Sequence, residues 1–152
     1  MGMINVEQVR AEALKELAPM IEPAQEFLAY VKGCLVSGVD TISKSQIENW
    51  MFSIPTLYGE LRCIEVDFFL TADLMDSQID KVKADAITNK GDGKVTDARA
   101  RAAQATHDLQ VRQQVAKYLG KYVNAIWSQF EMLIFSVRAL YESRHQKVNN
   151  DV

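Results

Sequence analysis

The second half of the chain repeats apolar residues at alternating steps of four and three positions. Thirteen such positions run from residue 98 to residue 140, and twelve of them are apolar. They are Ala98, Ala102, Ala105, Leu109, Arg112, Ala116, Leu119, Val123, Ile126, Phe130, Leu133, Val137 and Leu140. This spacing is typical of one long amphipathic helix with an apolar line, or seam, along one side. We therefore predict a helix over residues 97–146, capped by Thr96.

A similar seam lies earlier in the chain, before a loop. Its positions follow steps of three or four residues, and Pro55 suits the first turn of the helix. They are Leu57, Leu61, Ile64, Phe68, Ala72, Met75, Ile79, Val82 and Ala86. The stretch 88–94 contains Asn89 and two glycines, which adopt left-handed backbone angles readily. A short loop between two long helices predicts an antiparallel hairpin over residues 55–147, with its loop at 88–95.

The first part of the chain predicts shorter helices. Asn5 can cap a first helix, which Pro19 ends or kinks because proline has no amide N–H to donate. Pro23 suits the first turn of a second helix, and Gly38 ends that helix. Ser45 can then cap another short helical piece before the long hairpin begins.

These elements predict an all-α fold: a single helical domain over residues 1–152, with short helices over 1–52 followed by the coiled-coil-like hairpin. At about 1.5 Å per residue, the last helix is longer than its partner, so residues 127–146 extend beyond it. This end is apolar nearly all round and needs cover on several sides. We expect the N-terminal helices to cover one side and sister subunits another, which makes the protein a homo-oligomer. The predicted interface positions are Trp127, Phe130, Ile134, Phe135 and Tyr141.

Composition restricts the class of protein more than it identifies one. With 48% apolar and 24% charged residues among 152, the chain has the make-up of an ordinary soluble domain. No apolar run reaches the roughly 18 residues of a transmembrane helix, and the N-terminus lacks the basic start and apolar stretch of a signal peptide. Cys34 and Cys63 form neither a disulfide framework nor a metal set. We expect a cytoplasmic protein, in the host cytoplasm if a phage encodes it, with no membrane partner.

Charge divides the chain into two unequal halves. Residues 1–79 carry 5 basic and 12 acidic side chains, whereas residues 80–152 carry 12 basic and 8 acidic ones. A basic half can face a polyanion; the alternative is an ordinary solvated helix surface. Six basic residues surround the hairpin loop, where lysines can contact phosphates without reading base sequence. They are Lys81, Lys83, Lys90, Lys94, Arg99 and Arg101.

Catalytic chemistry has no matching constellation in the sequence. Glu142 and His145 have the E-x-x-H spacing of a carboxylate-bridged metal site in a helical bundle, but such a site needs a second copy, and none exists. No P-loop, G-x-S-x-G or G-x-G-x-x-G motif occurs. The prediction is a protein that is not an enzyme and needs neither a cofactor nor a metal.

Three residues on the last predicted helix allow more than one interpretation. Arg112 is the single charge on its seam: it specifies register or oligomeric state, contacts nucleic acid, or extends past small alanines into solvent. Tyr118 and Tyr122 lie four residues apart beside lysines. They either stack on nucleic-acid bases or pack within the hairpin.

A helix, a loop with Gly-Asp-Gly, and a long helix carrying Asp108, Tyr118 and Gly120 resemble the UvsY family of phage recombination mediators over roughly residues 60–145. The resemblance implies a ring-forming homo-oligomer that binds single-stranded DNA. It also implies help in loading a RecA-like recombinase onto strand coated by a single-strand-binding protein. The family's DNA contacts would fall on the six basic residues around the loop.

Two functions of different classes follow. The first is an oligomeric accessory protein of phage DNA recombination or replication, with single-stranded DNA, a recombinase and a single-strand-binding protein as partners. The alternative is a non-catalytic structural, adaptor or inhibitor protein that acts through protein–protein contacts of a helical bundle.

Overall fold

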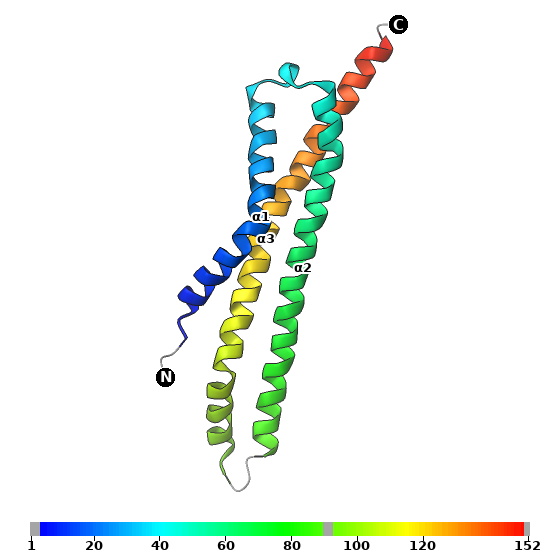
Figure 1. Cartoon of the computed structure of the whole chain (residues 1–152). Helices are drawn as coiled ribbons and strands as arrows, with labels where there is room; N and C mark the ends of the chain where they lie inside the picture. Colours follow the sequence, from blue (N-terminus) through cyan, green and yellow to red (C-terminus); the bar gives the residue numbers. More distant parts are fainter. Residues whose placement is uncertain (1–3, 90–92, 151–152) are drawn as a thin grey trace. The chain divides into compact units, whose positions relative to one another are not determined.

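The computed structural model describes residues 4–89 and 93–150, with side chains as far as residue 147. Three long helices and one short 3₁₀ helix account for nearly all of it (Figure 1). They are α1 (Val6–Ser37), η1 (Val39–Thr41), α2 (Lys44–Thr88) and α3 (Val95–Asn150). Within the two described ranges there is no strand, which confirms the all-α prediction. Lys90 lies outside the described residues.

Helix α1 is continuous where the sequence predicts an interruption. It begins at the predicted cap, where the Asn5 side chain accepts a hydrogen bond from the Glu7 amide at 3.0 Å, and it runs through Pro19 and Pro23. Both prolines are exposed, so their rings turn away from the buried side. The buried residues of α1 form one stripe that passes both prolines: Leu17, Ile21, Ala24, Leu28 and Val31. Burial of this stripe outweighs the local cost of the missing amides.

Helix α2 begins with a capping box at Ser43, two residues before the cap predicted at Ser45. The Ser43 hydroxyl accepts a hydrogen bond from the Gln46 amide at 3.2 Å, and the Gln46 side chain accepts one from the Ser43 amide at 2.9 Å. The S-x-x-Q spacing, rather than Ser45, marks this start. The helix continues through Pro55, so the short piece and the first arm of the hairpin are one element.

The remaining boundaries differ only by a few residues from the prediction. Gly38 ends α1 with φ of 136°, a conformation that disfavours residues with a Cβ. Helix α3 begins at Val95, two residues before the predicted start at 97. The Lys94 carbonyl accepts the first amide hydrogen bonds, from Asp97 and Ala98. Thr96 is therefore inside the helix and is not its cap.

The chain divides into two compact units. Unit 1 comprises Met1–Glu16 and Glu65–Lys121, and unit 2 comprises Leu17–Ile64 and Tyr122–Val152. Helices α2 and α3 run antiparallel in each unit, as expected for a hairpin (Figure 1).

Unit 1 is built around small residues. Its buried hydrophobic side chains are Ala72, Ile79, Ala98, Ala102, Val111, Val115, Ala116 and Leu119. Thr106 is also fully buried, and its hydroxyl donates to the Ala102 carbonyl at 2.8 Å. A Cβ on Gly120 would lie 3.0 Å from the Phe69 ring, so the two helices approach closely there. The Arg10 guanidinium lies 4.3 Å from the centre of the Tyr118 ring, which fixes the start of α1 against α3.

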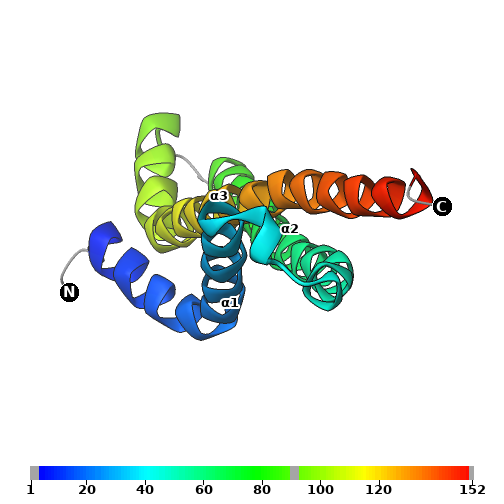
Figure 2. The same cartoon turned by 90° about the horizontal axis from the view of Figure 1, so that it is seen from above.

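Unit 2 contains the larger side chains. It comprises the second part of α1, the start of α2 and the end of α3, which carries the C-terminus (Figure 2). The buried residues that α2 and α3 contribute are Ile47, Trp50, Ile54, Leu61, Val123, Ile126, Phe130, Leu133 and Val137. The Tyr30 and Trp50 rings meet edge to face at 6.1 Å between centroids. This is a three-helix core of bulky aliphatic and aromatic groups.

The seam predicted for α2 is confirmed, and the one predicted for α3 is displaced in its middle. All nine α2 positions are buried or half-buried. On α3, Ala98 and Ala102 are buried, as are all predicted positions from 116 to 137, but Ala105 and Arg112 are exposed. Thr106 and Val111, which lie between these two positions, are buried instead, and so is Val115 one turn further on. Alanine offers little apolar area, so the larger valines determine which side of α3 is buried.

Candidate nucleic-acid interface

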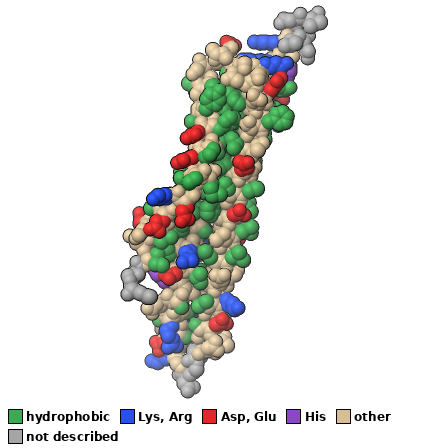
Figure 3. Space-filling view, viewed as in Figure 1, with side chains coloured by type: hydrophobic (Ala, Val, Ile, Leu, Met, Phe, Trp, Pro, Cys, Tyr) green, Lys and Arg blue, Asp and Glu red, His purple; other side chains and the backbone are tan. Residues whose placement is uncertain are grey.

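The described basic residues near the hairpin loop lie in unit 1, on the ends of α2 and α3 or, for Lys94, directly before α3. The structure describes five of the six, all of them exposed: Lys81, Lys83, Lys94, Arg99 and Arg101. None forms a salt bridge with another described residue. Figure 3 shows basic and acidic side chains interspersed at this end of the unit. The cations are therefore available to an anionic partner, but carboxylates lie among them.

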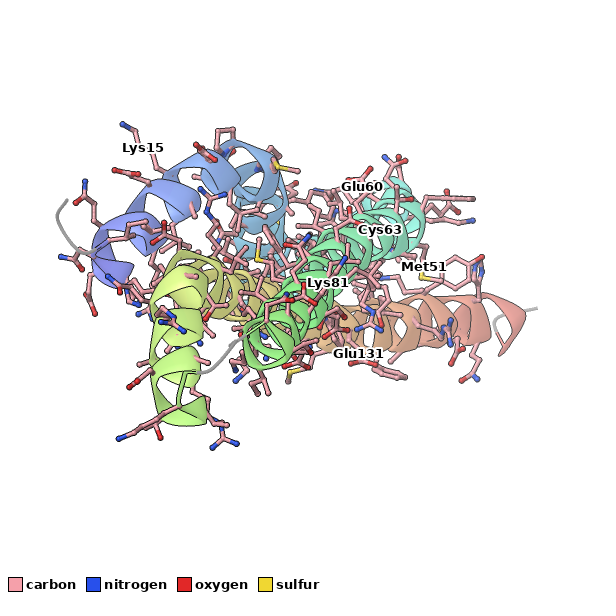
Figure 4. The ribbon with its side chains drawn as sticks, turned by 90° about the horizontal axis from the view of Figure 1, so that it is seen from below. Lys15, Met51, Glu60, Cys63, Lys81 and Glu131 are labelled. Carbon is pink, nitrogen blue, oxygen red and sulfur yellow. The ribbon has the colours of Figure 1, made fainter. Side chains whose placement is uncertain are left out.

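Helical geometry distributes the four cations on α2 and α3 on two sides of the hairpin. Residues two positions apart on a helix differ by about 200° in direction. Val82 is half-buried, so Lys81 (Figure 4) and Lys83 project to opposite sides of the α2–α3 contact. On α3, Arg99 follows a buried alanine and Arg101 precedes one, so these two also project to opposite sides.

The antiparallel arrangement determines which cations share a side. In two antiparallel right-handed helices, the residues that directly follow a seam position on each helix lie on the same side of the pair. Lys83 and Arg99 both follow such a position, and Lys81 and Arg101 both precede one. The hairpin therefore has a Lys83–Arg99 flank and a Lys81–Arg101 flank, at nearly the same distance from the loop.

The two flanks differ in local charge. Asp85 lies four residues after Lys81, and Asp97 lies four residues before Arg101, so each cation of that flank has an exposed carboxylate on its own side. On the other flank only Lys83 has such a neighbour, Asp80, three residues earlier. On α3, no acidic residue lies three or four positions before or after Arg99. The Lys83–Arg99 flank is thus the more positive of the two.

The tyrosines beside this region are engaged within the protein. Tyr118 is half-buried, and Arg10 covers one face of its ring. Tyr122 is also half-buried. This arrangement supports the packing interpretation of Tyr118 over stacking on bases. Arg112 is exposed because the buried side of α3 turns there to Val111 and Val115, so it is not a charge within the seam.

The five predicted interface residues of unit 2 lie in different surroundings. Phe130 has no exposed surface, so it cannot contact a second subunit while unit 2 is folded. Trp127 packs edge to face against Tyr58 at 5.5 Å and beneath the Arg62 guanidinium at 4.5 Å. Phe130 and Trp127 therefore both contribute to packing inside unit 2. Ile134 and Tyr141 are half-buried, and of the five only Phe135, at 65%, is exposed.

A line of exposed apolar residues on α2 was missed by the sequence analysis. Val66, Leu70 and Leu74 are 47%, 56% and 66% exposed and follow one another at steps of four along one side of the helix in unit 1. Asp67 and Asp73 lie next to them and are exposed too. The signal was present as a second apolar repeat beside the seam. The seam alone is enough to predict a helix, so this second repeat adds nothing to the prediction of secondary structure.

The other candidate chemistry is limited. In residues 4–89 and 93–147, no three His, Cys, Asp or Glu side chains are placed to hold a metal ion together. Cys34 and Cys63 are both free thiols. No described helix has an apolar stretch long enough to cross a bilayer.

Comparisons with protein-family models, with curated proteins and with solved structures found no match to this chain.

Proposed function

We propose that this chain is a non-catalytic, homo-oligomeric protein that binds single-stranded DNA through the Lys83–Arg99 flank of its hairpin. The observation that supports this proposal is the pair of exposed cations, one from each helix, with a single carboxylate beside them. A phosphodiester strand that lies along the flank neutralises both charges and releases its counterions. Such contacts carry no base specificity, because they reach only phosphates.

Binding by one hairpin alone is weak, since two phosphate contacts contribute little at physiological salt. A homo-oligomer presents several hairpins to one strand, and each further contact then forms at high effective concentration. An accessory factor of phage recombination or replication needs this kind of binding. Such a factor holds the strand firmly through the whole assembly, yet each single contact is weak enough to release the strand locally. It displaces a single-strand-binding protein and passes the strand to a RecA-like recombinase.

The two flanks provide a matched experiment. The variants Lys83→Glu/Arg99→Glu and Lys81→Glu/Arg101→Glu change the net charge equally, on the same helices and at nearly the same distance from the loop. We expect the first to weaken binding of labelled oligo-dT by at least about tenfold in fluorescence anisotropy at 50 mM salt, and the second to weaken it much less. Equal losses would show that only net charge matters. No binding by the wild type at this salt would reject the DNA function.

The second candidate is a structural or adaptor protein, and the line Val66, Leu70 and Leu74 favours it. Exposed apolar residues in a row are typical of a protein–protein contact. Under this proposal the chain binds another protein chain through this line of residues on α2. Leu70→Glu places a charge in the middle of the line, so the complex with that chain should no longer be detected by light scattering. The same variant leaves oligo-dT affinity per subunit unchanged if DNA binding depends on the flank alone.

A further inference from the structure

Unit 2 contains a surface pocket with a cationic lining that is separate from the hairpin loop. Its cavity volume is about 420 Å³, within the range of roughly 300–1,000 Å³ that is common for small-molecule sites. The charged residues that line it are Lys44 at the start of α2, Arg144 and Lys147 near the end of α3, and Asp40 in η1. With three cations and one carboxylate, the lining has a net positive charge before His145 is counted.

Arg144 is held in place without losing its charge. Its guanidinium donates hydrogen bonds to the carbonyls of Val39 and Ile42, which join the end of α3 to the segment before α2. Carbonyl oxygens carry no net charge, so these bonds orient the guanidinium without neutralising it. The guanidinium has five N–H donors, which leaves donors for a ligand. A half-buried, fixed cation is a common feature of an anion site.

The two lysines are less restrained, and the helix start adds to the positive potential. Lys44 approaches Glu48 only at 3.8 Å, and both side chains are well exposed, so this ion pair is weak. Lys147 is exposed and has no ion pair with a described residue. Lys44 also begins α2, whose N-terminal end carries the positive pole of the helix dipole.

The remaining wall is apolar and aromatic. Ile47 is only 1% exposed and lines the pocket. Tyr141 and His145 stand edge to face, with ring centroids 4.2 Å apart, and both line the pocket. An inorganic anion would contact the cations but would leave the apolar and aromatic wall exposed to water. The combination fits an anion joined to a flat or apolar group.

We propose that this pocket binds a phosphomonoester, with its phosphate among Lys44, Arg144 and Lys147 and its organic part against Tyr141 and Ile47. A phosphomonoester is close to a dianion at neutral pH, which matches the net charge of the lining better than a carboxylate does. The ligand is either a free nucleotide or the terminal phosphate of a strand, since both present this group. The proposal does not depend on the DNA-binding flank, because the pocket shares no residue with it.

Calorimetric titration of the full chain at low salt tests the proposal with three probes: adenosine monophosphate, adenosine and inorganic phosphate. We expect the monophosphate to bind, inorganic phosphate to bind more weakly, and adenosine not to bind. In Lys44→Gln/Lys147→Gln, monophosphate affinity falls by at least about tenfold, because two charge-assisted contacts are lost. Failure of the wild type to bind the monophosphate, or equal affinity for adenosine, overturns the proposal.

A matched control removes two lysines elsewhere. Lys15→Gln/Lys121→Gln changes the net charge by the same amount at exposed positions of unit 1; Figure 4 shows the Lys15 side chain projecting away from α1. This control keeps wild-type affinity for the monophosphate, whereas an equal loss in both variants contradicts a local site. Competition with oligo-dT carrying either a 5′-phosphate or a 5′-hydroxyl then distinguishes the two sources. Displacement by the phosphorylated strand alone identifies the strand end as the ligand; displacement by neither identifies the free phosphomonoester.

Discussion

The two units use the same three helices but are packed with different side chains. The buried hydrophobic residues of unit 2 are almost all Leu, Ile, Val, Trp or Phe, whereas half of those in unit 1 are alanine. Burial of a large side chain contributes far more to stability than burial of an alanine. From this difference we expect unit 2 to contribute more to stability than unit 1, whose small residues let its helices approach closely.

The division also separates two arrangements of cations. In unit 1, cations lie on both flanks of a slender helix pair and point into solvent. In unit 2, Arg144 and the aromatic pair Tyr141–His145 line a pocket. An extended polyanion suits the first arrangement, and a small anion suits the second.

The largest expected effect comes from the core of unit 2. Phe130→Ala removes a fully buried ring and destabilises the protein by about 3–5 kcal/mol in urea unfolding, because the surrounding helices cannot close the cavity. Phe135→Ala, five residues away on the same helix, removes a ring that is 65% exposed and changes stability by less than about 0.5 kcal/mol. Similar losses in the two variants would contradict the assignment of unit 2 as the main source of stability.

A smaller effect tests the displaced seam in unit 1. Val111→Ala deletes two buried methyl groups and costs about 1.5–2.5 kcal/mol, whereas Arg112→Ala costs less than about 0.5 kcal/mol. The regular repeat in the sequence instead places position 112 in the seam and Val111 outside it. Thermal and urea unfolding of the two single variants decide between the registers.

The smallest effect concerns the start of α2 in unit 2. Ser43→Ala removes the hydroxyl that accepts the Gln46 amide and lowers the free energy of unfolding by about 1 kcal/mol. Ser45→Ala lies inside the helix and is neutral or slightly stabilising, since alanine is the better helix former. A loss confined to Ser45→Ala would restore the boundary that the sequence analysis expected.

Much of the helical framework could be predicted from the sequence, because long apolar repeats dominate the signal. The α2 seam and the caps at Asn5 and Gly38 are confirmed. Local rules failed where tertiary burial outweighs them: Pro19 and Pro23 do not interrupt α1, because the buried stripe on its other side continues past both.

The site could be predicted only as a set of basic residues. Their division into two flanks depends on how α2 and α3 pair, which neither helix reveals alone. The cationic pocket was not predictable for a related reason: it joins Lys44 to residues about a hundred positions later in the chain. Phe130 was expected at a surface because its partners on other helices, far away in sequence, were not known.

The salt dependence of oligo-dT binding tests the central proposal most directly. Each phosphate contact on a single strand contributes about 0.7 to the slope of log affinity against log salt. Lys83→Glu/Arg99→Glu removes two contacts from every bound hairpin, so the slope should become shallower by about 1.4 for each hairpin engaged. Wild-type binding with the same slope as this variant would contradict the assignment of the Lys83–Arg99 flank as the DNA contact.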